Sequence, residues 1–380
     1  MIDITQNSYV LHVYRTYFPD PPGGLQEAIR QIALAGTAAG LEQHIYALSP
    51  SPVPMQIARP EGRVVRSRSW MAPASCDIGG IGALRLFSRL ARETSLLHYH
   101  FPWPFADFLH SVTKPAAPAV MTYHSDIVRQ RLLGSLYSPL MWSMLRSMKA
   151  IVATSPAYIR TSPVLSHPTI RDKVRMIPLG IEENSYPDDG DDSVFGRIYL
   201  HADEPYFLFV GMLRYYKGLD FLVQAAKSVA AKVVIAGSGP ELPRLKTLAS
   251  EMDVKNVVFA GQVTDAEKVA LLKNCRALIL PSHLRSEAFG MVLVEAAMLG
   301  RPLISCEIGT GTSYVNVHEE TGFVVPPMNP DVLAKAMISL LMDERLAASF
   351  GRHARTRYEQ FFSGKAMGRA YAELYREVMS

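Results

Sequence analysis

The sequence predicts two α/β domains, each a doubly wound parallel β-sheet with helices on both faces. Three observations lead to this fold class: a length of 380 residues, an alternation of short apolar runs with helical patterns, and a polar stretch near the middle of the chain. Domains usually hold about 100 to 200 residues, so the chain is too long for one core. Short β-branched runs that alternate with helical segments are typical of parallel sheets joined by crossover helices.

The same alternation occurs in both halves of the chain. The first half contains YVLHVY, QHIYAL, SLLHYH, AVMTYH and KAIVATS, starting at residues 9, 43, 95, 119 and 149; the second contains EPYFLFVG, AKVVIAGSG, KNVVFAG, RALILPS and RPLISCE, starting at 204, 231, 255, 276 and 301. Between them lies ENSYPDDGDD, whose polar residues, proline and glycine are typical of an interdomain connection. We therefore expect an N-terminal domain at 1–184, a linker at 185–200, a C-terminal domain at 201–363, and a final helix at 364–380 that packs back toward the N-terminal domain.

The composition indicates a packed globular protein of the cytoplasm. Hydrophobic residues make up 48% of the chain, but no run reaches the roughly 18 to 20 uninterrupted apolar residues of a membrane-spanning helix. The first residues lack the basic and then apolar layout of a signal peptide. Cys76, Cys275 and Cys306 have no spacing typical of zinc sites or disulfide frameworks, so we expect buried thiols.

Charge is divided unevenly along the chain. Residues 1–180 contain 18 lysines and arginines against 10 aspartates and glutamates, and residues 181–380 contain 21 against 25, which gives +8 and −4. A basic half indicates an anionic partner, such as a phospholipid surface, a lipid-diphosphate acceptor or nucleic acid, or else a solvated basic face. Its arginines lack the interleaved aromatic residues of a single-strand binder, which disfavours nucleic acid.

Common nucleotide and cation motifs give little support to other enzyme classes. Neither domain has GxGxxG after its first strand or GxxxxGK[ST], so a dinucleotide dehydrogenase or a P-loop enzyme is disfavoured. Asp188, Asp189, Asp191 and Asp192 have spacings that could hold a divalent cation, but acidic linkers are usually solvated. Ligands of open α/β sheets bind beyond the carboxyl ends of the strands, so site residues are expected there.

The strongest site pattern is PSHLRSEAFGMVLVEAAML at 281–299, which follows a strand and leads through a glycine into an apolar helix. The N–H groups around Phe289, Gly290 and Met291 would be the unpaired donors of that helix end, and together with the helix dipole they could hold a diphosphate. Glu287 precedes the helix and Glu295 lies near its first turns. Carboxylates accept hydrogen bonds from neighbouring hydroxyls, so the two suit a ribose and a hexose; alternatively they only cap the helix and complement its dipole.

A second pattern, VGMLRYYKGLDFLVQA at 210–225, places Arg214 and Lys217 at a turn between strand and helix. Two permanent cations above the sheet could neutralise a leaving diphosphate without a metal ion. Taken singly, each would more often be a surface charge. Their occurrence together with the glutamate loop favours the anion site.

The first half offers weaker signals. Gly23 and Gly24 precede a helix, where glycines let backbone approach a phosphate or a sugar closely. His124 ends the strand AVMTYH and could donate a hydrogen bond to the sugar or the phosphate, although such a histidine is more often structural. His98 and His100 share one strand face, and we interpret them as packing rather than as the lining of an acceptor cleft.

Together these residues resemble the retaining glycosyltransferases usually called family 4, whose GT-B architecture has two Rossmann-like domains facing each other across a cleft. The matching segments follow the family's order over nearly the whole chain. They are PPGG at 21–24, TYHSD at 122–126, IPLGI at 177–181, GMLRYYKGLD at 211–220, AGSGPE at 236–241, AGQV at 260–263 and PSHLRSEAFGMVLVEA at 281–296. A further segment, EIGTGTSYVNVHEETGFVVPP at 307–327, is similar to bacterial O-antigen mannosyltransferases and D-rhamnosyltransferases, which use GDP-sugars.

The resemblance implies a role for each residue of the C-terminal site. Glu295 would bind the nucleotide ribose, and Arg214 and Lys217 would bind the diphosphate. Glu287, with the backbone from Phe289 to Met291, would hold the donor sugar. Transfer would retain the anomeric configuration and would need no metal or other cofactor.

The resemblance also implies contacts by residues outside that loop. Gly237 and Val263 would flank the base, while His124, Gly23 and Gly24 would complete the site from the other domain. The expected partners are a GDP-sugar donor, a polyprenyl-diphosphate-linked glycan acceptor of lipopolysaccharide O-antigen synthesis, and the anionic inner face of the cytoplasmic membrane, with peripheral attachment.

Three other functions remain open from the sequence. A UDP-sugar enzyme of the same family with another acceptor would share the general family motifs, but not the segment at 307–327 that is similar to the GDP-sugar enzymes. A sugar-nucleotide 2-epimerase would share the two-domain form but need no acceptor. A non-catalytic two-lobed binding protein would have no need for paired cations and paired carboxylates in one site. Residues 60–95, where acceptor loops of the family lie, match nothing that identifies the acceptor.

Overall fold

The computed structural model describes residues 9–20, 23–73, 76–127, 131–201 and 204–380, except for the side chains of 131–136. The chain forms two compact units, an N-terminal unit of Met1–Gly180 with Gly364–Ser380, and a C-terminal unit of Ile181–Ser363. The expected linker at 185–200 thus belongs to the C-terminal unit, and the expected final helix belongs to the N-terminal unit. Pro21 and Pro22 of the PPGG segment lie outside the described residues.

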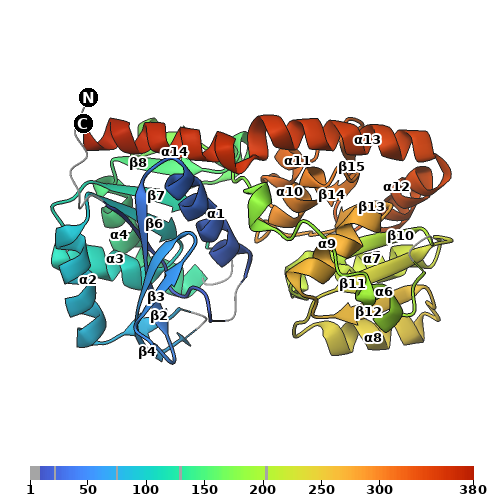
Figure 1. The fold of residues 1–380 in the computed structure, drawn as a ribbon, viewed down its shortest axis with the longest axis horizontal. Helices are drawn as coiled ribbons and strands as arrows, with labels where there is room; N and C mark the ends of the chain where they lie inside the picture. Colours follow the sequence, from blue (N-terminus) through green and yellow to red (C-terminus); the bar gives the residue numbers. More distant parts are fainter. Residues whose placement is uncertain (1–8, 21–22, 74–75, 128–130, 202–203) are drawn as a thin grey trace. The chain divides into compact units, whose positions relative to one another are not determined.

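The N-terminal unit is a nine-stranded sheet covered by helices (Figure 1). Its strands are β1 (Tyr9–Val13), β2 (Glu42–Ser49), β3 (Gln56–Arg59), β4 (Gly62–Met71), β5 (Ile78–Gly79), β6 (Leu96–Phe101), β7 (Ala119–Tyr123), β8 (Ala150–Ala153) and β9 (Val174–Met176). Its helices are α1 (Gly24–Ala38), α2 (Ile81–Glu93), α3 (Pro104–Thr113), α4 (Arg131–Ser147), α5 (Pro156–Thr161) and α14 (Gly364–Met379). The strand order is β3-β4-β2-β1-β6-β7-β8-β9, with β5 paired to β4, so the order reverses between β1 and β6.

Helix α14, at the end of the chain, packs against α1. The two helices approach closely at Gly368, where an added Cβ would lie 2.7 Å from the carbonyl oxygen of Ala35. On the sheet, Tyr371 and Tyr375 of α14 hydrogen-bond to Thr122 and His98, respectively. Residues far apart in the sequence therefore meet on one face of the N-terminal sheet.

The C-terminal unit contains the second sheet. Its strands are β10 (Tyr206–Val210), β11 (Lys232–Ala236), β12 (Val257–Gly261), β13 (Ala277–Leu280), β14 (Leu303–Cys306) and β15 (Gly322–Val325). Its helices are α6 (Ser193–Arg197), α7 (Leu219–Ala226), α8 (Leu242–Glu251), α9 (Asp265–Asn274), α10 (Met291–Met298), α11 (Thr312–Val315), α12 (Pro330–Met342) and α13 (Glu344–Arg357). All pairings are parallel, in the order β12-β11-β10-β13-β14-β15. This is the order of a Rossmann sheet, with its switch point between β10 and β13.

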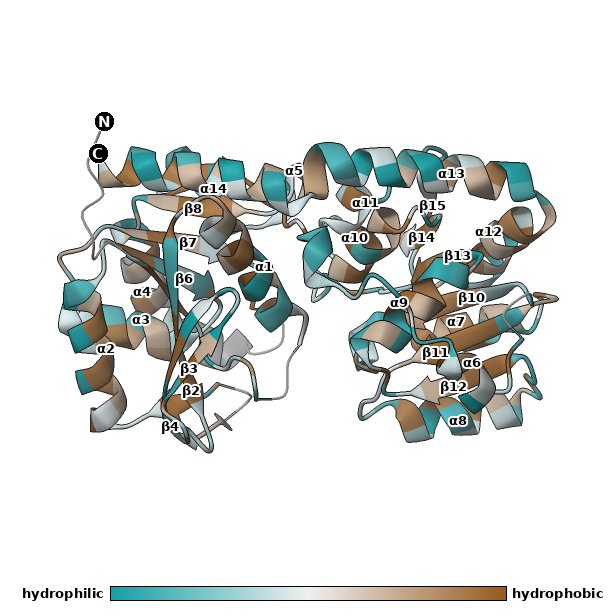
Figure 2. Cartoon of the chain, viewed as in Figure 1, coloured by the Kyte–Doolittle hydropathy of each residue, from teal (hydrophilic) through white to brown (hydrophobic). Residues whose placement is uncertain are grey.

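The predicted fold class is confirmed in both units, and all ten predicted strands are present. In Figure 2, β7, β10 and β11 are drawn mostly in the hydrophobic colour, as expected for strands covered on both faces. Pairing in the N-terminal sheet departs from the parallel pattern at β3 and β5, which run antiparallel to β4. Sequence patterns did not reveal β4, because the charged Arg63, Arg66 and Arg68 interrupt its apolar residues.

Two expectations from composition can be compared with the structure. Cys275 and Cys306 are buried, whereas Cys76 is only half-buried. In the described part of the chain, no helix combines the length and apolar character that a membrane crossing requires.

Candidate active site

The cationic turn and the glutamate loop meet at the switch point of the C-terminal sheet. Arg214 and Lys217 follow β10, and Glu287 follows β13, its neighbour in the sheet. The backbone N–H of His283 donates to the carbonyl of Tyr216 at 3.0 Å, which joins the two loops. Two segments predicted separately from the sequence therefore form one site at the carboxyl edge, where open α/β sheets bind ligands.

Lys217 and Glu287 form a buried ion pair at this edge. The two residues are only 9% and 8% exposed, and the ammonium group donates to Glu287 Oε2. Ser282 Oγ donates to the same oxygen at 3.0 Å. Burial lowers the pKa of Lys217, but Glu287 and Tyr216 outweigh it, so that this pKa ends above its ordinary value. Lys217 is therefore a permanent cation, whereas Arg214 beside it is exposed.

Gly290 is the N-cap of α10 and has φ +85. An added Cβ would also lie 2.8 Å from Leu280 Cδ2, so both conformation and space favour glycine here. Phe289 is buried and packs edge-on against Phe362, with 6.1 Å between ring centroids. The turn fixes the N–H groups from Phe289 to Met291 at the helix end, where an anion can be bound.

The segment GTGTSYVN hydrogen-bonds to the backbone of this loop. Thr310 Oγ1 donates to the carbonyl of Glu287, and the N–H of Gly311 donates to the carbonyl of Ala288, each at 2.8 Å. An added Cβ on Gly311 would lie 2.5 Å from the ring of Phe289. The segment that resembles the GDP-sugar enzymes therefore holds the backbone of the loop expected to contact the donor sugar.

Glu295 lies on the second turn of α10 and is buried. Its Oε1 accepts hydrogen bonds from Tyr186 Oη at 2.6 Å and from Lys268 Nζ at 3.2 Å. Burial lowers the pKa of Lys268, but Glu295 and Asp265 outweigh it, and the pKa is raised overall. Within the described part of the chain, no hydrogen bond engages Oε2, which leaves that oxygen for a ligand.

Gly237 and Val263 also lie at the carboxyl edge, after β11 and β12. Gly237 has φ +139, and a Cβ there would lie 2.0 Å from the carbonyl oxygen of Gly211. Val263 is half-buried and precedes Thr264, whose hydroxyl caps α9 together with Glu267. The close approach of Gly211 thus requires glycine at 237.

In the N-terminal unit, Gly23 is the N-cap of α1 and Gly24 its first residue. The N–H of Gly23 donates to Gln26 Oε1 at 3.0 Å, and Gln26 in turn donates to Thr16 at 2.8 Å. A Cβ on Gly24 would meet nothing within 4 Å. Gly24 is not required by packing within the described chain, which is consistent with close approach of a ligand to this helix end.

His124 follows β7 in the same unit and is 6% exposed. Its backbone N–H donates to the carbonyl of Phe101 at 3.1 Å. Its ring Nε2 lies 3.0 Å from Nδ1 of His100. Burial lowers the pKa of His124 to about 3, so the ring is neutral at physiological pH.

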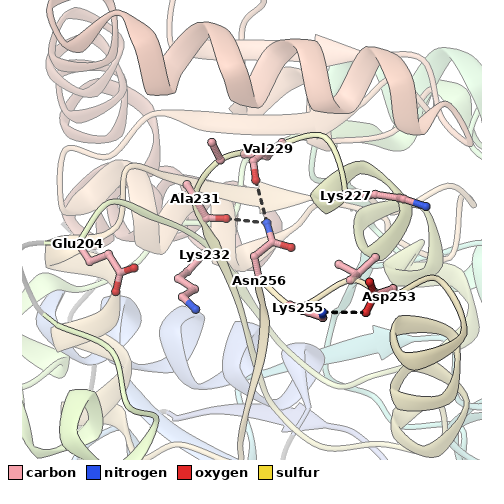
Figure 3. Close-up of a pocket in the computed structure, with 10 residues that line it drawn as sticks. Glu204, Lys227, Val229, Ala231, Lys232, Asp253, Lys255 and Asn256 are labelled. Carbon is pink, nitrogen blue, oxygen red and sulfur yellow. Dashed lines mark hydrogen bonds and ion pairs between the residues drawn. The ribbon is translucent and has the colours of Figure 1, made fainter.

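A hollow elsewhere on the C-terminal unit does not belong to this site (Figure 3). It lies where β11 and β12 begin, whereas the site residues lie where the strands end. Asn256 donates to the carbonyls of Val229 and Ala231 at 2.9 and 2.8 Å, which closes the turn before β11. The other residues that line the hollow include the exposed Lys227 and Lys255. We assign the hollow a structural role.

The structure brings together the predicted residues of each unit and adds partners that sequence reasoning missed. Tyr186, Lys268 and Ser282 were not predicted, although each hydrogen-bonds to a predicted glutamate. Tyr186 lies within the segment interpreted as a linker, so nothing local marked it. The four linker aspartates considered as cation ligands are exposed.

A Rossmann sheet with cations and carboxylates at its switch point, preceded by a second, mostly parallel sheet, is the arrangement expected of a GT-B glycosyltransferase. Family models agree: Glycosyltransferase Family 4 matches residues 22–185, and Glycosyl transferases group 1 matches residues 195–357. The chain belongs to glycosyltransferase family 4.

Two curated relatives extend over nearly the whole chain. D-rhamnosyltransferase WbpZ of Pseudomonas aeruginosa is 43% identical, over 93% of this chain and 92% of that protein. O-antigen chain mannosyltransferase C of Escherichia coli is 39% identical, over 97% and 98%. Among solved structures, sucrose-phosphate synthase from Thermosynechococcus elongatus has a TM-score of 0.78 at 23% identity, with 97% of this chain and 98% of that chain covered, which shows the same fold.

Proposed function

We propose that this enzyme transfers mannose or D-rhamnose from a GDP-sugar to a polyprenyl-diphosphate-linked glycan during synthesis of the lipopolysaccharide O-antigen. The observation that carries this proposal is the identity of 43% and 39% to a D-rhamnosyltransferase and an O-antigen chain mannosyltransferase over more than nine-tenths of the chain. The GTGTSYVN segment supports it, because Thr310 and Gly311 contact the loop assigned to the donor sugar.

In this proposal the donor is bound mainly by the C-terminal unit. Arg214, Lys217 and the N-terminus of α10 neutralise the diphosphate, since cations and helix N–H groups both attract anions. Glu295 binds the ribose through Oε2, and Glu287 binds hydroxyls of the sugar. Gly237 and Val263 flank the base. His124 and the backbone at Gly23 and Gly24 contact the donor as well, by resemblance to the family.

The reaction proceeds at the front face of the sugar, with retention and without a metal ion. The bond between the anomeric carbon and the diphosphate oxygen breaks, and the acceptor oxygen forms its bond on the same face. The acceptor's proton passes to the leaving diphosphate oxygen. Lys217 and Arg214 stabilise the negative charge that develops on the diphosphate. Glu287 already hydrogen-bonds to Lys217 and Ser282, which suits a binding role better than that of a nucleophile.

Calorimetric titration with GDP, UDP and ADP tests the donor class. We expect GDP to bind most tightly, with or without EDTA. GDP-mannose and GDP-D-rhamnose are then each incubated with a synthetic polyprenyl-diphosphate-linked glycan, and the product's anomeric configuration is read by NMR. Preference for UDP would replace the proposal with a UDP-sugar enzyme of the same family. Turnover of a sugar nucleotide to its epimer without acceptor would indicate a 2-epimerase.

We further propose that the N-terminal unit attaches peripherally to the inner face of the cytoplasmic membrane through the end of β4 and helix α2. Trp70, Met71 and Ile81 are 67%, 60% and 63% exposed, and Trp70 lies against Gly80, just before α2. Arg85 and Arg89 are exposed on the same helix. Exposed apolar residues beside basic ones suit an interface with anionic lipid.

Vesicle pelleting tests the membrane proposal. We expect binding to phosphatidylglycerol vesicles that weakens with salt, because screening reduces attraction between surface charges. Trp70→Gln and Arg85→Gln should each reduce it, whereas Met342→Gln, at an exposed methionine of the C-terminal unit, should not. Equal pelleting with phosphatidylcholine and at high salt would contradict the proposal.

A further inference from the structure

A line of buried polar side chains runs through the N-terminal sheet and ends at His124. Gln43 Oε1 lies 2.8 Å from His12 Nε2, His12 Nδ1 lies 2.9 Å from His100 Nε2, and His100 Nδ1 lies 3.0 Å from His124 Nε2. The four residues come from β2, β1, β6 and the end of β7, which are neighbours in the sheet. In Figure 2, β6 is partly drawn in the hydrophilic colour, although all six of its residues are buried.

The amide of Gln43 has one possible orientation. Its Nε2 donates to the carbonyl oxygen of Leu41 at 3.0 Å, and a carbonyl can only accept, so Oε1 must face His12. An added Cβ on Gly36 would lie 2.6 Å from Gln43 Nε2 and 2.8 Å from Cδ. The amide is therefore held against α1 at a point where only a glycine leaves it room.

This orientation sets the proton positions of all three histidines in the line. Because Gln43 Oε1 accepts, His12 must carry its proton on Nε2, and a neutral His12 then accepts at Nδ1. His100 must then donate from Nε2 to His12 and accept at Nδ1. His124 in turn must donate from Nε2 to His100, which leaves its own Nδ1 as an acceptor. Burial lowers the pKa of His12 to about 4, that of His124 to about 3 and that of His100 well below its ordinary value, so the rings are neutral.

We propose that Gln43 is a positioning residue that, through His12 and His100, fixes His124 as the tautomer with an acceptor at Nδ1. His124 then accepts a hydrogen bond from a hydroxyl of the donor sugar, and it does not donate to a phosphate oxygen. The hydrogen bond to the donor sugar rests on the proposed function, whereas the assignment of the tautomer does not. The proposed accepting role of His124 differs from the expectation from the sequence, in which the His124 ring donates.

The opposite tautomer is disfavoured by the same contacts. A proton on His124 Nδ1 would require the protons of His100 and His12 to move as well, which would leave the lone pair of His12 Nε2 facing Gln43 Oε1. Rotating the Gln43 amide would only transfer this conflict to Leu41, where two oxygens would meet. One amide therefore sets the direction of three hydrogen bonds.

The other polar groups around the line do not change the direction of its hydrogen bonds. His98 stacks on His100 and lies tilted against His12, and it is hydrogen-bonded on both ring nitrogens, to Tyr375 at Nδ1 and to Thr122 at Nε2. His12, His98 and His100 lie close enough together to hold a metal ion. In the structure, however, their ring nitrogens are already hydrogen-bonded to protein groups, which favours the hydrogen-bonded line.

The tautomers can be observed directly by two-bond 1H–15N spectra of protein labelled with 15N-histidine, assigned with single histidine variants. We expect His12, His100 and His124 to carry their protons on Nε2 at pH 7. A GDP-sugar should shift the Nδ1 resonance of His124 without protonating it. A proton on Nδ1 in the free protein, or one gained on ligand binding, would overturn the inference. So would stoichiometric zinc whose removal with EDTA moves the His12, His98 and His100 signals.

Variants test the role of Gln43. Gln43→Met removes the acceptor at similar volume, and Gly36→Ala displaces the amide without touching it chemically. We expect either change to give a mixture of His124 tautomers and to lower kcat/KM for the donor about five- to tenfold, the effect of one hydrogen bond. Gln31→Met, at a buried glutamine of α1 outside the line, is the matched control and should change neither. Unaltered tautomers in both Gln43→Met and Gly36→Ala would refute the assignment. Tautomers that respond as expected in a protein that binds no nucleotide sugar would refute the proposed function alone.

Discussion

Lys217 and Glu287 form a buried ion pair although they lie 70 residues apart in the sequence. Each follows a different strand of the C-terminal sheet, so the pair ties β10 to β13 at the switch point. Removing one member of a buried pair leaves the other charge uncompensated and typically destabilises a protein by about 3–5 kcal/mol. The pair therefore couples the stability of the C-terminal unit to the proposed diphosphate site.

Removing the charges of Lys217 and Glu287 one after the other separates the effect on stability from the effect on catalysis. We expect Lys217→Met to lower both the stability of the C-terminal unit and kcat, the latter by about 100- to 1,000-fold as for other electrostatic stabilisers of transition states, with a smaller rise in donor KM. Adding Glu287→Gln should restore much of the stability, because no unpaired charge remains, but none of the transfer rate. Urea unfolding and steady-state kinetics measure the two quantities.

The exposed Lys246→Met on α8 is a matched control for the loss of a lysine. It should leave both quantities unchanged. Transfer by Lys217→Met at close to the wild-type rate would show that Lys217 does not stabilise the leaving diphosphate.

Tyr186→Phe tests the orientation of the proposed ribose ligand. The phenol donates to Glu295 Oε1 at 2.6 Å, so its loss should leave the carboxylate less well oriented and weaken nucleotide binding by about 1 kcal/mol, or roughly fivefold in Kd. Calorimetry measures Kd. Tyr199→Phe, at a tyrosine that is 94% exposed, should bind as the wild type does. Unchanged affinity in Tyr186→Phe would mean that Glu295 needs no support from the phenol.

The sequence predicted the features that depend on residues close together in the chain. All ten expected strands are present, and the charged residues placed at their carboxyl ends do lie there, because a strand and the turn that follows it are continuous in the chain. Contacts between distant segments were not predictable. Arg66 is buried in the middle of β4, where its guanidinium donates to the carbonyl of Pro54 at 2.6 Å, and no local pattern reveals such a partner.

The same reason explains the gaps in the predicted site. Tyr186 is 109 residues from Glu295, in a segment whose polarity resembles a linker. His98 and His100 were correctly interpreted as packed residues. Their alternation could not show that His100 hydrogen-bonds to His12 and His124, because strand order is needed to bring three strands together.

Asp107 should make the N-terminal unit less stable as the pH rises from about 4 to 8. It is buried on α3 and accepts a hydrogen bond from Tyr137; burial raises its pKa to about 8, although the hydrogen bond opposes this. Between its unfolded pKa of about 3.9 and pH 8, the folded state keeps a proton that the unfolded state has lost, so stability falls by up to about 1.4 kcal/mol per pH unit.

Asp107→Asn should remove this contribution while preserving an acceptor for Tyr137. Asp172→Asn, at an exposed aspartate of the same unit, is the control. The readout is urea unfolding followed by tryptophan fluorescence, which reports on the N-terminal unit alone, because Trp70, Trp103 and Trp142 all belong to it. The same pH slope in Asp107→Asn and wild type would exclude a protonated Asp107.

Below about pH 7 the buried histidines should reverse that trend. Burial lowers the pKa of His12 to about 4 and that of His98 well below its ordinary value, with His100 and His124 shifted in the same direction. As the pH falls through about 6.5, the histidines of the unfolded state bind protons, whereas the buried rings of the folded state do not. Each ring can therefore lower the free energy of unfolding by up to about 1.4 kcal/mol per pH unit. Four such rings outweigh the single opposing proton of Asp107, so the N-terminal unit should be most stable near pH 7. His98→Phe should reduce the acid slope by about one proton, since it removes one titrating ring, whereas the exposed His201→Gln in the C-terminal unit should not change it. An N-terminal unit as stable at pH 5 as at pH 6.5 would mean that the histidines are not held neutral by burial, and the hydrogen-bonded line that ends at His124 would lose its fixed direction.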